Sequence, residues 1–148
     1  MITFDELNAE NHKITELSNV FLYLIKERSM CDTDIACDVF FDYVAKVNHH
    51  LELVDKHLYT KLLNSPDQAV RQKADRFMSG SNEVKRIFKA YLGKWSKQSR
   101  KELIIRNHKK FMQDTQDVMD IVLDRIQRET EHLYPLVRRE TGSNKIAA

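Results

Sequence analysis

Two stretches of this chain, HLELVDKHLYT at residues 50–60 and RIQRETEHLYP at residues 125–135, share a His-Leu-Tyr phrase at the same place. Each phrase ends an amphipathic stretch and follows a polar position from which a helix could present a metal ligand. Laid on each other, the two stretches pair His50 with Arg125 and Val54 with Glu129. A two-fold helical repeat of this kind predicts a helical bundle with a site at its centre.

Apolar residues recur at helical spacing in four segments that contain or flank these stretches. The segments cover about 4–26, 34–63 and 66–95, and a last helix begins between 101 and 107 and ends near 139. The polar cluster at 31–34 offers an N-cap to the second helix. We expect Ser65 to cap the third helix, with Pro66 at its first helical position. The Ser-Gly-Ser sequence at 79–81 can kink or break that helix.

The composition of the 148 residues suits a soluble globular chain, with 42% hydrophobic and 31% charged residues. A net charge of +2 supplies no electrostatic footprint for nucleic acid. The sequence has no apolar run long enough to span a membrane and no signal-peptide pattern at its start. Cys31 and Cys37 match no zinc or redox spacing, so we expect reduced thiols and a cytoplasmic protein.

The connections between the predicted helices are short, and only 3 Gly and 2 Pro interrupt the chain. Three of the helices cover roughly 30 residues, or about 45 Å each. Short connections make successive helices antiparallel, so the expected fold is all-α, an up-down-up-down antiparallel four-helix bundle without a sheet. We expect one domain over residues 1–140 and a flexible C-terminal tail over 141–148.

The second helix carries polar residues inside its apolar stripe. His50, Val54 and His57 are spaced four and three residues apart, so they share one face of the helix. Asp55 lies five residues after His50, at the edge of the same broad face. Side chains on facing helices of a bundle converge at one level, which is how bundle interiors build metal sites.

The fourth helix repeats this arrangement with Arg125, Glu129 and His132. Glu129-x-x-His132 is half of the Glu-x-x-His pattern that carboxylate di-iron bundles use. Its counterpart on the second helix is Val54-x-x-His57, in which the carboxylate is missing. The two halves of the repeat are therefore unequal in the ligands that they offer.

The candidate metal ligands are His50, Asp55, His57, Glu129 and His132. Imidazole and carboxylate groups suit iron, manganese or zinc. In the alternative, structural interpretation, Glu129 pairs with the arginine one turn earlier, because an unpaired buried carboxylate is costly. Asp55 then bonds a neighbouring helix, and the histidines of the two His-Leu-Tyr phrases are partly exposed.

The chain resembles the hemerythrin-like, HHE cation-binding family over roughly residues 7–139. Residues 50–59 are similar to the family pattern on its second helix, and residues 125–136 to the pattern on its fourth. The segments 88–95 and 111–115 also resemble one bacterial branch of the family. The resemblance implies a four-helix bundle that holds a non-haem di-iron centre. Family members bind or sense oxygen, handle nitric oxide or peroxide, or store and report iron.

The sequence departs from the family pattern at the ligand positions. The expected glutamate of the second helix is Val54, and the expected histidine of the fourth helix is Arg125. On the first helix the expected histidine falls at Asn11, while His12 should point away from the core. His108 matches no ligand position, and we expect it to be solvated. The ligand of the third helix falls near residues 79–81, where Glu83 is the nearby carboxylate.

Only His50 and Glu129 carry over from the family residue for residue, and two ligands cannot complete a di-iron site. We therefore expect no stoichiometric di-iron centre and favour a metal-free state over bound non-haem iron. A weaker mononuclear site stays open, because His57 and His132 lie one turn further along the same faces and could turn inward.

Three classes of function remain open. The first is a metal-free regulatory or sensing module with the family's fold. Val54 and Arg125 favour it, because they stand where ligands are expected. The alternative is a protein that binds non-haem iron or another metal and senses or carries oxygen, nitric oxide or iron. The third, an enzyme acting on oxygen or peroxide, lacks a nucleophile–base pair or cofactor motif, so we expect no enzyme. A protein partner fits the first class, in a monomer or homodimer, without nucleic acid or membrane.

Overall fold

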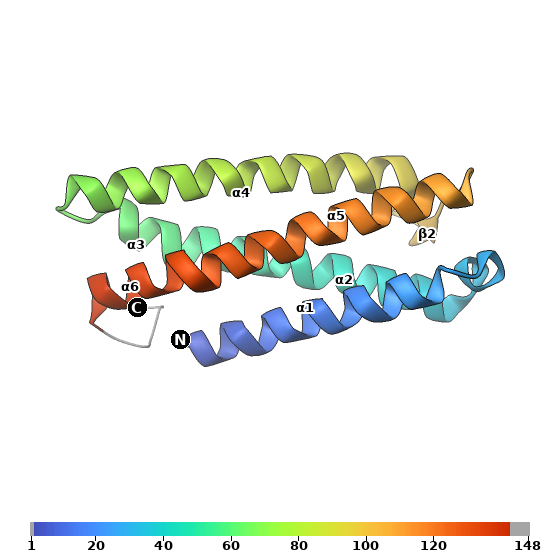
Figure 1. Cartoon of the computed structure of the whole chain (residues 1–148), viewed down its shortest axis with the longest axis horizontal. Coiled ribbons are helices and arrows are strands. Elements are labelled where there is room, and N and C mark those ends of the chain that lie inside the picture. The colour runs from blue at the N-terminus through green and yellow to red at the C-terminus, as the bar shows by residue number, and fades with distance from the viewer. Residues whose placement is uncertain (1, 143–148) are drawn as a thin grey trace.

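The computed structural model of the chain describes residues 2–142, and these are almost wholly helical (Figure 1). The α-helices are α1 (Phe4–Leu24), α2 (Asp34–Leu53), α3 (Thr60–Leu63), α4 (Gln68–Trp95), α5 (His108–Arg128) and α6 (Tyr134–Thr141). A π-helical segment, η2 (Val54–Tyr59), joins α2 to α3, and a second, η3 (Glu129–Leu133), joins α5 to α6. A short 3-10 helix, η1 (Arg28–Asp32), precedes α2. The prediction of an all-α chain is confirmed.

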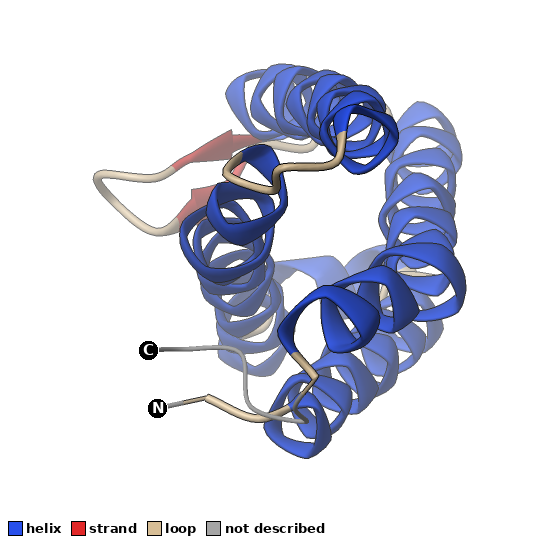
Figure 2. Ribbon diagram, turned by 90° about the vertical axis from the view of Figure 1, so that its left-hand side faces the viewer, coloured by secondary structure: helices blue, strands red, loops and turns tan. Residues whose placement is uncertain are grey.

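The helices form four long rods, namely α1, the run α2–η2–α3, α4, and the run α5–η3–α6. The first rod packs mainly against α2 and also contacts α5, while α4 packs against α5 and α3. Viewed along their length, the rods surround a common axis in a bundle-like arrangement (Figure 2). The axis is therefore lined by side chains from every rod.

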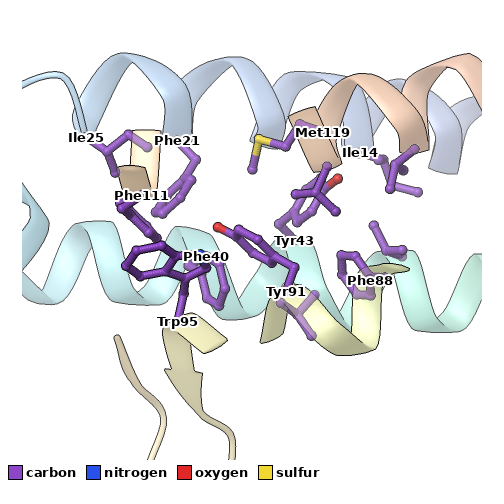
Figure 3. Packing of buried hydrophobic residues seen from close by; sticks show 14 of the residues in the cluster. Ile14, Phe21, Ile25, Phe40, Tyr43, Phe88, Tyr91, Trp95, Phe111 and Met119 are labelled. Atoms are coloured by element: carbon purple, nitrogen blue, oxygen red, sulfur yellow. The ribbon is translucent and has the colours of Figure 1, made fainter. Parts of the chain in front are cut away.

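Two clusters of buried apolar residues fill this axis, one after the other. In the first cluster each rod supplies an aromatic ring, and Figure 3 shows Phe21, Phe40, Trp95 and Phe111 gathered at one end. The ring centroids of Phe21 and Phe40 lie 5.2 Å apart, and those of Trp95 and Phe111 lie 5.4 Å apart. Such tilted and edge-on contacts add stability beyond the burial of the rings.

The second cluster contains the leucines and tyrosines of both His-Leu-Tyr phrases. Between the two clusters every rod carries at least one buried polar residue. These residues are Asn11, His50, Ser81, Arg125 and Glu129. We call this group the polar layer, because it separates the apolar clusters along the axis of the molecule.

The helix starts follow from local capping. Thr3 and Glu6 form a capping box at α1, and the side chain of Thr33 accepts a hydrogen bond from the backbone of α2, as the cluster at 31–34 predicts. The expected cap of the third rod is wrong. Asp67 caps α4, whereas the Ser65 hydroxyl accepts from the backbone N–H of Asp67 at 3.2 Å. The Ser-Pro-Asp sequence thus forms a tight turn before the helix begins.

The possible break at residues 79–81 does not occur, because α4 runs unbroken from Gln68 to Trp95. Gly80 faces the fourth rod, and a Cβ atom built on it would lie 2.7 Å from Nη1 of Arg125. The glycine therefore serves a close approach between two rods rather than a break in the helix. Ser81, next to it, is fully buried.

A two-stranded hairpin, β1 (Ser96–Lys97) and β2 (Glu102–Leu103), joins α4 to α5, although no sheet was expected. Lys101 takes a positive φ of 51° in its turn, and the N–H of Ile104 donates to the carbonyl of Trp95 at 2.7 Å. The residues of this connection are polar enough to suggest an open loop. The backbone pairing comes from the close approach of the chain at the end of α4, which sequence periodicity does not encode.

The end of the last rod also differs from the expectation. Thr141 belongs to α6, and Gly142 ends the helix with a left-handed φ of 63°. Residues 143–148, the rest of the predicted tail, lie outside the described part of the chain. Within the described part, no helix combines the length and apolar character that crossing a membrane requires.

Two histidines expected to be exposed have different surroundings. His12 is exposed and pairs with Glu16 on the outside of α1, as predicted. His108 was expected to be solvated, but its Nε2 lies 2.6 Å from the carbonyl oxygen of Ile25. This contact ties the start of α5 to the end of α1. Sequence spacing within one helix cannot reveal a contact with a distant backbone carbonyl.

Candidate functional site

The polar layer is the candidate site, because it brings ionisable side chains into the centre of the molecule. Glu129 is 0% exposed, His50 is 3% exposed and Arg125 is 8% exposed. Burial of an isolated charge is costly, so each of these groups must have a partner. The partners come from different rods, and together they form a connected network.

His50 and Glu129 form the shortest link of this network. Nε2 of His50 lies 2.7 Å from Oε1 of Glu129, across the space between the second and fourth rods. The repeat placed both residues on inward faces, and the structure brings them into contact. With a proton on Nε2, the imidazole donates to the carboxylate in a charge-assisted hydrogen bond.

Arg125 forms the second part of the network and contacts three rods. Its Nη2 donates to the hydroxyl of Tyr59 at 2.6 Å and to the backbone carbonyl of Phe77. Its Nε lies 3.6 Å from Oε2 of Glu129, so the predicted ion pair one turn apart is present. The guanidinium also stacks over the Phe77 ring, 5.1 Å from its centroid. The cation is thus held by an anion, a hydroxyl, a carbonyl and an aromatic face.

The two His-Leu-Tyr phrases place their tyrosines beside this network in matching ways. Both phrases fall in or just after the π-helical segments, and both tyrosines are buried. The hydroxyl of Tyr59 accepts from Arg125, and the hydroxyl of Tyr134 accepts from Nδ2 of Asn11 at 3.0 Å. The sequence repeat is therefore also a structural repeat, with one tyrosine from each half in the layer.

The electrostatics of the layer keep both phenols protonated. The pKa of Tyr59 is raised to about 12, chiefly by burial and also by the charge of Glu129, while Arg125 opposes this shift. Burial also raises the pKa of Tyr134, and the hydrogen bond from Asn11 partly offsets this effect. In the folded protein both hydroxyls therefore stay neutral over the physiological range of pH.

π-Helical turns are uncommon, and they occur often at functional sites. Here the wider turns lie in η2 and η3, at corresponding places in the two halves of the repeat. Where η2 ends, the hydroxyl of Thr60, the first residue of α3, donates to the carbonyl of Asp55, five residues earlier. Continuous α-helices were expected in both places. A π-helical turn is wider than an α-helical one, so it shifts which side chains point inward. Tyr59 ends η2, and Tyr134 directly follows η3.

The other predicted ligands do not join His50 and Glu129. Asp55 pairs with Lys85 of α4, so its carboxylate bonds a neighbouring helix. His57 is half-buried. His132 is exposed, and its Nε2 lies 3.8 Å from Glu131. The structure therefore places these three predicted ligands apart from the His50–Glu129 contact.

The remaining positions that the family resemblance suggested also have clear places. Asn11 is buried in the layer, at the position where the family pattern has the histidine of the first helix. Ser81 lies inward on α4, at the level expected for the third ligand. Glu83 instead faces outward and pairs with Arg86. The first and third rods therefore offer an amide and a hydroxyl to the layer.

These donors do not fit a di-iron centre. Within residues 2–142, no group of three or more His, Cys, Asp and Glu side chains lies close enough to hold a metal ion. His50 and Glu129 bond each other, and a fixed positive charge lies against the same carboxylate. A divalent ion beside Glu129 would be repelled by the guanidinium. What the layer can do chemically is hold charge and protons in a fixed network.

Sequence reasoning missed several residues that contact the layer, namely Tyr59, Phe77, Gly80 and Tyr134. The tyrosines stood in the repeated phrase itself, which was the available signal. The roles of Phe77 and Gly80 depend on a backbone carbonyl and on the absence of a Cβ atom. Neither feature has a sequence motif.

No protein-family model matches the chain, and searches of curated proteins and of solved structures found no match.

Proposed function

We propose that this protein is a hemerythrin-like, up-down-up-down antiparallel four-helix bundle in which a buried arginine takes the place of the metal centre. It acts as a regulatory or sensing module for a protein partner and not as an enzyme. The residues at 54 and 125 support this proposal, since a valine and an arginine stand where the family pattern has ligands. The polar layer would then be retained for its charge network rather than for iron.

The observation that carries the proposal is the position of the Arg125 guanidinium. It lies beside the fully buried Glu129 and also bonds Tyr59 and the Phe77 carbonyl. A buried carboxylate needs a compensating positive charge. In the family a metal ion would supply that positive charge. In this protein the side chain of Arg125 supplies it, so no metal ion is needed.

The burial of the layer also supports a role other than catalysis. His50 and Glu129 are 3% and 0% exposed, so a substrate has no direct access to them. Catalysis needs reactive groups within hydrogen-bonding reach of a bound substrate. A buried network instead suits a module that changes its packing or its partner when the network is disturbed.

Metal analysis of protein purified without oxygen from iron-replete cells tests the proposal. We expect far less than one iron per chain, and a chelator should leave the melting temperature unchanged. A ligand of the folded state stabilises it by mass action, about 2.7 kcal/mol at 100 times its Kd, so a bound metal would be revealed by this treatment. Two irons per chain would overturn the proposal, and one tightly held metal would favour the mononuclear alternative.

A reversal experiment makes the test sharper. The double variant Val54→Glu/Arg125→His places the family residue types at both altered positions. We expect it to gain an iron-dependent rise in melting temperature that the unmodified protein lacks. The control Val54→Leu/Arg125→Leu, which offers no ligand, should show no such rise. Equal behaviour of the two variants with iron would contradict the role proposed for positions 54 and 125.

A further inference from the structure

A surface cleft of about 460 Å³ lies between α4 and the η3–α6 part of the fourth rod. Figure 1 shows that α4 begins and α6 ends at the same end of the molecule. Its lining residues are Lys73, Arg76, Phe77, Glu131, His132, Pro135, Leu136 and Arg139. A smaller hollow shares Arg76, Phe77 and His132 and extends to Arg125 and Arg128. The volume is in the range of small-molecule sites.

Three cations of this cleft are not neutralised by the protein. Within the described residues, no carboxylate pairs with Lys73, Arg76 or Arg139, although other exposed arginines do pair. Arg86, for example, is paired with Glu83, and Arg128 with Asp124. Like charges that face one hollow attract anions into it.

The acidic group of the cleft does not neutralise these cations. One carboxylate oxygen of Glu131 accepts from the side-chain amide of Gln127 at 2.9 Å, and the other lies 3.8 Å from Nε2 of His132. Both contacts hold it to its own helical rod. The positive character of the cleft therefore comes from both walls, with Lys73 and Arg76 on α4 and Arg139 on α6.

The floor of the cleft is apolar. Phe77, Pro135 and Leu136 line it between the charged groups. Small-molecule sites combine an apolar lining with a few placed polar groups, which fix the orientation of the ligand. An ion without an apolar part would leave this floor unused, whereas an organic anion would cover it.

We propose that this cleft binds a small organic phosphate ester, with its phosphate among Lys73, Arg76 and Arg139 and its apolar body over Phe77. A phosphate carries up to two negative charges, which three cations match better than a carboxylate with one. Arginine also recognises phosphate in a planar, two-point arrangement. The assignment does not rest on the metal-free interpretation of the polar layer, because the three cations that bind the phosphate lie outside that layer.

Isothermal titration with phenyl phosphate tests the site directly. We expect saturable binding to the unmodified protein at one site per chain. The double variant Lys73→Gln/Arg76→Gln should weaken this binding about tenfold, which is the effect of losing two partly exposed charge contacts. The control Lys89→Gln/Arg106→Gln removes the same charge from exposed positions outside the cleft, and its affinity should stay within about twofold.

Each further outcome decides the assignment. The assignment is supported if benzoate and inorganic phosphate both bind more weakly than phenyl phosphate. Benzoate lacks the second negative charge, and inorganic phosphate lacks the apolar body. Inorganic phosphate that binds as tightly as phenyl phosphate overturns the organic part of the proposal. Absence of saturable binding to the unmodified protein, or an equal loss in the charge-matched control, overturns the site as a whole. Circular dichroism of each variant verifies that it is folded.

Discussion

Nε2 of His50 lies 2.7 Å from Oε1 of Glu129, although 79 positions separate the two residues in the chain. This contact joins corresponding helical rods of the two halves of the repeat. Both groups are buried, and Arg125 lies against the second oxygen of the same carboxylate. The charge balance of the molecule's centre therefore depends on three side chains, which can be tested one by one.

Removal of the cation should be strongly destabilising. We expect Arg125→Ala to lower the free energy of unfolding by about 3–5 kcal/mol, because Glu129 is left buried without its positive partner. Urea denaturation followed by circular dichroism measures this change. The control is Arg128→Ala, whose side chain is exposed and paired with Asp124, and it should change stability by about 0.5 kcal/mol or less. A similar small loss for Arg125→Ala would show that the pair does not support the fold.

Removal of both charges should cost much less than removal of one. We expect Arg125→Leu/Glu129→Leu to recover a large part of the loss seen for Arg125→Ala, since apolar residues of similar volume need no compensating charge. Glu129→Leu alone should remain strongly destabilised, because it leaves the guanidinium buried. The same urea series measures all three variants. A double variant as unstable as the sum of the singles would mean that the two charges act independently.

Two glycines of α4 should respond in opposite directions to the same substitution. A Cβ atom at Gly80 would lie 2.7 Å from Nη1 of Arg125, a side chain held by several contacts. Gly80→Ala should therefore destabilise the protein by about 1–3 kcal/mol. Gly93 has open space around the Cβ position, so Gly93→Ala should add about 0.5–1 kcal/mol from helix propensity. Thermal melts of the two variants compare them directly.

A further variant distinguishes a steric effect at Gly80 from a loss of helix stability. In the Arg125→Ala background the added methyl group meets no guanidinium. Gly80→Ala should then become neutral or stabilising, as at Gly93. If the cost of Gly80→Ala persists there, contact with Arg125 does not explain it.

Alkaline pH should destabilise the fold through its buried tyrosines. Burial raises the pKa of Tyr59 from 10.0 to about 12, so the unfolded chain loses this proton at lower pH than the folded one. The resulting stabilisation is fully present below pH 10 and is lost as pH rises toward about 12. Tyr59→Phe should make the decline shallower in that window, by up to about 1.4 kcal/mol per pH unit.

Urea denaturation at several pH values within this window measures the slope. The control is Tyr23→Phe, because Tyr23 is 72% exposed and its substitution should leave the slope unchanged. The slope is compared rather than the stability itself, since Tyr59→Phe also removes a hydrogen bond from Arg125. Equal slopes for Tyr59→Phe and the unmodified protein would contradict the shift assigned to Tyr59.

Much of the helical organisation could be predicted from periodicity. The stripes on the rods, the cap at Thr33 and the outward position of His12 follow from spacing within one element. The same spacing placed His50 and Glu129 inward, and both are buried. The errors fell where backbone contacts between distant segments decide the outcome, as at the hairpin after α4 and at His108.

The sequence by itself determined which face of each helix is buried, and therefore which polar residues enter the centre. Helical spacing fixes the direction of a side chain around its own axis, and this needs no knowledge of the other rods. The repeat of the His-Leu-Tyr phrase also determined that two halves of the chain would contribute in parallel ways.

Only the tertiary structure decided how those residues are paired. Whether Glu129 meets His50, and whether Arg125 reaches Tyr59 and the Phe77 carbonyl, depends on the rotation and separation of the rods. The wider turns of η2 and η3, together with the missing Cβ atom at Gly80, affect the rotation and separation of the rods at this level. Interactions across helices depend on distances of a few ångströms, and packing sets these distances, whereas periodicity sets only direction.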